Sequence, residues 1–210
     1  MQINIKYPGV KILPAGKFNK AENKINGFYD SIVKNFIKYC EKILYKTAAY
    51  QKNADGFKPF GAVMTFETTY NNQDFLCVYL DINIYAGKGR GNIIRKAQIW
   101  NLTSGELYSP KRIINFNKPM KMKVCEHICK TMEHQIKYGK ERYINADTPS
   151  VYKQNVYNHL NIYNMFITEN GYAFFFPQNT IAPNDSGIVD FVVPEKILKE
   201  NENGKFMRGS

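Results

Sequence analysis

Apolar residues recur along this chain at two periods, and the two periods predict different elements. Between residues 25 and 44 they return every three or four positions, which is typical of an amphipathic helix with one broad apolar face. From Leu76 to Ile84 the aliphatic residues return at every second position, which is typical of a strand. The pattern therefore predicts a long helix packed on a sheet.

The sheet is expected to begin as an antiparallel meander. Two strands, residues 60–70 and 75–85, are separated by the turn sequence Asn71-Asn72-Gln73-Asp74. A third strand ends at Trp100, after a glycine-rich turn from Gly87 to Gly91. Successive strands joined by such short turns pair with their neighbours in the sequence.

The C-terminal part of the chain contains the clearest hairpin. Residues 165–167 lead into Glu169-Asn170-Gly171, and an uninterrupted apolar run at 172–176 follows. Asn-Gly supplies the positive φ angles of a tight hairpin turn, and an apolar run of this length predicts a strand buried on both faces. We expect the hairpin to complete the sheet of the meander.

The loop at residues 177–187 separates that hairpin from a last strand at 188–193. Pro183 restricts the backbone around it, so we expect the loop to be ordered. Asn179, Asn184 and Asp185 carry side chains suited to bonding the loop's own backbone groups.

The remaining elements are a short strand at residues 2–7 and three helices, at 111–115, 119–139 and 151–160. The fold class predicted is α+β, with an antiparallel sheet, helices packed on one face, and two sub-domains that share a core. The domain boundaries predicted are 1–110, 111–200 and a tail at 201–210, whose last residues we expect to derive from a vector.

The charge of the chain limits its partners. With 29 basic and 18 acidic residues it has a formal net charge of +11, which favours anionic partners such as lipid headgroups or cell-wall polymers. The basic residues are scattered, with doublets only at Arg95-Lys96 and Lys111-Arg112, so nucleic acid is disfavoured. The sequence contains no apolar run of about 18 residues, so it predicts no transmembrane segment, and no signal peptide is visible.

Reactive residue types are present, but their spacing predicts no catalytic or metal site. Cys40, Cys77, Cys125 and Cys129 are expected to be free thiols, although the last two lie one helical turn apart and could reach one metal ion. No second Cys or His cluster completes a zinc site, and no nucleophile motif surrounds Ser186. We therefore expect no enzyme activity, no metal and no cofactor.

Two sets of short motifs carry a family resemblance. Ile181-Ala182-Pro183, Gly187 and Pro194 resemble the C-terminal pattern of the RsiV-like anti-sigma factor extracytoplasmic domain family. Tyr85-Ala86-Gly87 and the segment 101–106 resemble turns of the same family and of the N-terminal domain of the peptidoglycan deacetylase PdaC. The chain departs from the family pattern at 88–90, 179–180 and 184–186.

The resemblance implies a non-enzymatic extracytoplasmic sensor or binding domain of a Gram-positive bacterium. Its partner would be a cell-wall polymer or a secreted protein, and an accessory role in a polysaccharide deacetylase system is the alternative. Lysozyme, which the resembling anti-sigma factor binds, is disfavoured because a +11 chain repels a basic protein. The candidate ligand-binding residues are Lys88, Arg90, Asn179 and Asp185. An extracytoplasmic or cell-surface location follows from the resemblance, and a cytoplasmic one stays open.

Overall fold

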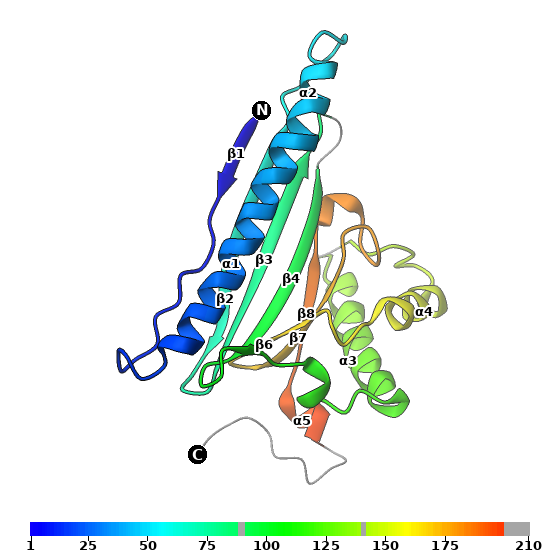
Figure 1. Cartoon of the computed structure of the whole chain (residues 1–210). Coiled ribbons are helices and arrows are strands. Elements are labelled where there is room, and N and C mark those ends of the chain that lie inside the picture. Colours follow the sequence, from blue (N-terminus) through cyan, green and yellow to red (C-terminus); the bar gives the residue numbers. More distant parts are fainter. Residues whose placement is uncertain (88–90, 140–141, 200–210) are drawn as a thin grey trace. The chain divides into compact units, whose positions relative to one another are not determined.

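The computed structural model describes residues 1–87, 91–139 and 142–199 and divides the chain into two compact units (Figure 1). The first unit is Met1–Leu107 and the second is Tyr108–Ser210. Both contain a sheet and helices, so the predicted α+β class is confirmed.

The first unit is built on a five-stranded sheet in the order β1-β2-β3-β4-β5. The strands are β1 (Gln2–Ile5), β2 (Gly61–Asn71), β3 (Phe75–Tyr85), β4 (Asn92–Asn101) and β5 (Glu106–Leu107). The meander β2-β3-β4 is antiparallel, as its turn sequences predict. β1 is parallel to β2, because a long helical crossover returns the chain in the same direction, and the sheet is therefore mixed.

A long helical segment lies across one face of this sheet (Figure 1). It consists of α1 (Asn19–Tyr39), the π-helical turn η1 (Cys40–Leu44) and α2 (Tyr45–Gln51), so it extends beyond the predicted residues 25–44 at both ends. Its buried residues pack in two clusters against apolar residues of the sheet. The buried helical residues in these clusters are Ala21, Ile25, Tyr29, Phe36, Cys40, Leu44 and Ala48.

The π-helical turn explains how the second half of this helix stays on the sheet. Phe36, Cys40, Leu44 and Ala48 are all buried and are spaced four residues apart. In a regular α-helix each such step would rotate the stripe by about 40°, because four residues exceed one turn of 3.6. The wider turn at Cys40–Leu44 takes up this excess and keeps the stripe facing the strands.

The second unit has its own three-stranded antiparallel sheet, in the order β6-β7-β8. The strands are β6 (Met165–Thr168), β7 (Gly171–Phe176) and β8 (Val189–Val193), and the helices are η2 (Pro110–Arg112), α3 (Lys118–Lys137), α4 (Pro149–His159), η3 (Asn184–Ser186) and α5 (Glu195–Lys199). All six residues of β7 are buried, as its apolar run predicts.

The prediction that the C-terminal hairpin completes the first sheet is wrong. β7 is hydrogen-bonded to β6 on one side and to β8 on the other, so both of its edges are occupied within the second unit. The hairpin signal in the sequence fixes only the pairing of β6 with β7. It contains no information about which sheet the hairpin joins.

Candidate functional site

The four residues predicted to bind a ligand do not form a described site. Lys88 and Arg90 lie outside the described residues. Asn179 and Asp185 both lie in the loop between β7 and β8, in the second unit. The structure therefore describes half of the predicted set.

Hydrogen bonds within this loop and to residues outside it hold its backbone. Thr180 Oγ1 donates to the carbonyl of Pro177 at 2.6 Å, and Gln178 Nε2 donates to the carbonyl of Asn184 at 2.9 Å. Ile181 is buried, and its carbonyl accepts from the backbone N–H of Ile144 at 2.9 Å. These bonds tie the middle of the loop to its two ends and to residues outside it.

Asn179 and Asp185 have structural roles in this loop. Asn179 takes a positive φ of 60°, a left-handed conformation that Asn tolerates better than most residues. The carboxylate of Asp185 forms an ion pair with the guanidinium of Arg142. A carboxylate repels an anion, so Asp185 does not favour an anionic ligand at this place.

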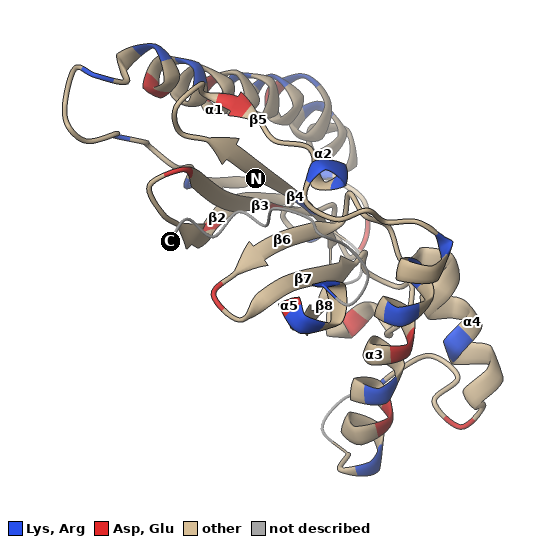
Figure 2. Cartoon of the chain, turned by 90° about the horizontal axis from the view of Figure 1, so that it is seen from below, with Lys and Arg blue, Asp and Glu red and all other residues tan. Residues whose placement is uncertain are grey.

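A stripe of lysines on the long helix of the first unit is the strongest candidate for a binding surface. We call Lys34, Lys38, Lys42 and Lys46 the outer stripe; all four side chains are exposed. Each lies two residues from a buried position such as Phe36 or Cys40, which places it about 200° around the helix and thus away from the sheet. Figure 2 shows basic residues along this helical segment.

The cations of the outer stripe are available to a ligand. None of the four ammonium groups makes an ion pair or a hydrogen bond in the described part of the chain. By contrast, Lys24 on the same helix is engaged by Glu106 at 3.3 Å. The outer stripe is therefore a line of ammonium groups without an ion-pair partner among the described residues.

Exposed apolar and aromatic side chains accompany the outer stripe. Ile43 is 54% exposed, Tyr45 58% and Tyr50 90%, although large apolar groups are usually buried. Tyrosine offers a flat ring for packing together with a hydroxyl for hydrogen bonding. The surface thus combines charge with groups that can contact an uncharged backbone.

Sequence reasoning missed the outer stripe because it looked for consecutive basic residues. The signal is the spacing of four between Lys34 and Lys46, which matches the spacing of the buried stripe from Phe36 to Ala48. On a regular α-helix these lysines would spread over about 120° of the surface. Only the π-helical turn aligns them, and its position was not predicted.

Two carboxylates of the first sheet, those of Asp81 and Glu67, are engaged by neighbouring side chains. Arg95 donates from Nε and from Nη2 to the two carboxylate oxygens of Asp81, each at 2.8 Å, and its guanidinium lies 3.8 Å from the ring centre of Tyr79. The Tyr79 hydroxyl donates to Glu67, and burial is the main cause that raises its pKa. This cluster is a network of ion pairs and hydrogen bonds across strands.

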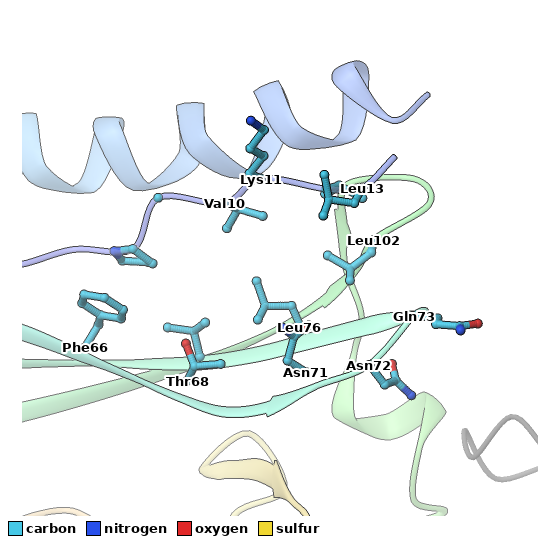
Figure 3. A pocket seen from close by; sticks show the side chains of 14 residues that line it. Val10, Lys11, Leu13, Phe66, Thr68, Asn71, Asn72, Gln73, Leu76 and Leu102 are labelled. Atoms are coloured by element: carbon cyan, nitrogen blue, oxygen red, sulfur yellow. The ribbon is translucent and has the colours of Figure 1, made fainter. Parts of the chain in front are cut away.

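A cavity of about 390 Å³ lies in the first unit between the segment 8–13 and the sheet (Figure 3). Phe66 and Leu76 project from the strands toward it, while the side chain of Lys11 points away from the strands. Its lining combines apolar side chains with Thr68 and the amides of the β2–β3 turn. The cavity offers space but no cluster of charged groups.

A second cavity, of about 690 Å³, lies in the second unit between α3 and α4. Cys125 and Cys129 line it with their sulfur atoms 4.0 Å apart, so the predicted free thiols are confirmed. The hydrogen bond with Cys129 and the nearby ammonium groups of Lys121 and Lys153 lower the pKa of Cys125. The same hydrogen bond, together with burial, raises the pKa of Cys129.

The described residues contain neither a membrane-spanning helix nor a ready metal cluster. None of their helices combines the length and apolar character needed to cross a membrane. In the same part of the chain, no group of three or more Cys, His, Asp or Glu side chains could hold a metal ion. His127 points to the carbonyl of Val192, at 3.2 Å, instead of toward the cysteines.

Comparison with known proteins finds solved structures of similar fold. No family model matches this chain, and no curated protein matches it. The crystal structure of a DUF3298 family member from Bacteroides fragilis is similar, with a TM-score of 0.62 and 14% identity over 94% of this chain and 82% of that one. A DUF3298 protein from Pseudomonas aeruginosa gives a TM-score of 0.49 and 11% identity over 72% of this chain and 66% of that one.

The first of these matches shows that the chain has the fold of a DUF3298 protein. At this identity the likeness concerns the fold and not the ligand. The resemblance to the RsiV-like and PdaC domains stays a prediction, because this match is to a DUF3298 protein.

Proposed function

We propose that this protein is a non-enzymatic, extracytoplasmic binding domain that captures a linear anionic cell-wall polymer on the outer stripe. The observation that carries the proposal is the alignment of Lys34, Lys38, Lys42 and Lys46 without partners among the described residues. The net charge of +11 supports it, because the whole chain attracts a polyanion at long range.

The geometry of the outer stripe suits a repeating anion. With a rise of 1.5 Å per residue, successive lysines lie about 6 Å apart and the stripe spans about 18 Å. Each exposed ion pair would contribute little by itself, since water and salt screen it. A polymer that contacts all four lysines releases several counterions at once. The contributions of the four contacts to its affinity therefore add up, and the affinity falls with rising salt.

The exposed side chains beside the lysines extend this surface. The rings of Tyr45 and Tyr50 and the side chain of Ile43 can pack on the uncharged repeat units of a polymer such as a teichoic acid. This contact would persist at salt concentrations that weaken the ionic part.

The proposal is tested by measuring the affinity of purified protein for teichoic acid. Replacing all four lysines of the outer stripe by Gln should lower the affinity about tenfold or more, since an exposed ion pair contributes about 0.2–1 kcal/mol and about 1.4 kcal/mol is a factor of ten. A matched control replaces four other exposed lysines by Gln and has the same net charge; it uses Lys96, Lys118, Lys137 and Lys196. An equal loss in both variants would show that net charge alone drives binding.

The choice of an anionic partner over a basic protein is tested with lysozyme. Like charges repel, so we expect no binding of lysozyme at low salt, where the repulsion is strongest. Lysozyme binding under these conditions would overturn the charge argument. An extracytoplasmic location, proposed from the family resemblance, predicts that protease added to intact cells degrades the protein.

A further inference from the structure

The cleft between α3 and α4 in the second unit brings two thiols together. Cys125 and Cys129 are only 8% and 3% exposed, yet both residues line the cavity, and we call this buried pair its floor. The two helices are tied across the cleft by Glu133 of α3, which accepts from the Tyr152 hydroxyl at 3.0 Å and pairs with Lys153 at 2.9 Å. The floor is therefore held by contacts on both helices.

The two thiols are close but poorly placed to form a disulfide. Residues four apart on a helix have Cβ atoms about 5–6 Å apart, whereas a disulfide needs about 3.5–4.5 Å. Closing the bond would distort α3 within Lys118–Lys137. The arrangement thus favours two free thiols that face one ligand.

The distance between the sulfur atoms fits a metal ion. An ion about 2.3 Å from each sulfur, at their 4.0 Å separation, would have an S–metal–S angle of about 120°. Zinc normally takes four protein or water ligands, and the described residues contain no group of three or more Cys, His, Asp or Glu that could hold a metal ion. Thiolates are the ligands that soft ions such as Cu(I) select. An S–metal–S angle of about 120° is that of a three-coordinate ion, so one position would remain for a ligand from the cleft.

We propose that Cys125 and Cys129 form a Cu(I)-binding site, with any further coordination position facing the cleft. Two thiolates and one Cu(I) carry a net charge of −1, which positive side chains nearby would stabilise. Lys153 lies on the opposite helix, and Lys121 of α3 is held 4.4 Å from the ring centre of Tyr157 in α4. Binding displaces the thiol protons to solvent as the two copper–sulfur bonds form.

This site is independent of the outer stripe. It lies in the other unit and takes a cation on sulfur ligands, whereas the outer stripe takes a polyanion on ammonium groups. Loss of either binding activity would leave the other proposal unaffected.

The test is a titration of the reduced full-length protein with Cu(I) under anaerobic conditions, in competition with a chromogenic Cu(I) chelator. We expect the wild-type protein to withdraw a single equivalent of Cu(I) from the chelator and to release protons into a weakly buffered solution. Cys125→Ser and Cys129→Ser should each abolish the withdrawal of Cu(I) and the release of protons. The matched control, Cys40→Ser with Cys77→Ser, removes two other buried thiols and should still bind Cu(I).

Two results would overturn the proposal. One is a wild-type protein that withdraws no Cu(I); the other is a Cys125→Ser, Cys129→Ser double variant that binds as much as the wild type. Cys129→Ala serves as a second variant in case the serine hydroxyl perturbs the cleft. Circular dichroism then confirms that each variant is folded before its titration is interpreted.

Discussion

A buried hydrogen bond between Tyr29 and Trp100 offers a sharp test of how the first unit is held together. The indole Nε1 of Trp100 donates to the hydroxyl oxygen of Tyr29 at 2.8 Å, and the two ring centres are 5.9 Å apart. The bond joins α1 to β4 across 71 positions of the sequence. Tyr29→Phe removes the acceptor and keeps the ring.

The cost follows from the burial of the donor. Trp100 can only donate through its indole nitrogen, and it is 3% exposed, so water cannot replace the lost acceptor. Leaving such a group unsatisfied costs about 1–3 kcal/mol. Each kcal/mol lowers the melting temperature of a domain of this size by about 4 °C or more.

The assay uses Trp100, the single tryptophan of the sequence, as a reporter of the first unit. Its fluorescence during urea unfolding should show a lower midpoint for Tyr29→Phe than for the wild type. Tyr50→Phe is the matched control, because Tyr50 is almost fully exposed and its hydroxyl should contribute less than about 0.5 kcal/mol. Equal midpoints for the two variants would refute the reasoning.

Three further variants probe packing, backbone and charge. Phe36→Asp should cost about 3–5 kcal/mol, because it buries a charge and deletes a large apolar side chain, whereas Ile37→Asp, at an exposed position, should melt close to the wild type. Gly171→Ala should lower the melting temperature of the second unit, because the glycine has a φ of 140° and a Cβ would collide with the carbonyl of Val193. The hydrogen bonds from the side chains of Lys153 and Tyr152 hold the pKa of Glu133 below its usual value. Its carboxylate therefore stabilises the fold above the unfolded-state pKa and ceases to do so as the pH falls through the folded-state pKa. The difference in melting temperature between wild type and Glu133→Gln should therefore shrink in acid.

Local pattern was enough to predict most of the elements. The alternation from Leu76 to Ile84 marks β3, and Asn170-Gly171 marks the turn between β6 and β7, because both signals arise within a few residues of the chain. The burial of the whole of β7 also follows from its composition alone. These predictions needed no knowledge of distant contacts.

Features that depend on long-range packing were not predictable in this way. The bond from Trp100 to Tyr29 and the pairing of Asp81 with Arg95 join separate elements. The separate sheet of the second unit depends on where β8 pairs, and the π-helical turn at Cys40–Leu44 depends on the sheet beneath it. Without that turn, the four lysines of the outer stripe would be spread further around the helix.

The salt dependence of polymer binding tests the central claim most directly. Four ionic contacts to a flexible polyanion should give a slope of log affinity against log salt of about −3, at roughly −0.7 per contact. Replacing Lys34, Lys38, Lys42 and Lys46 by Gln should remove most of this slope, and replacing Lys96, Lys118, Lys137 and Lys196 should leave it nearly unchanged. A slope that is the same in the wild type and in both variants would contradict the account.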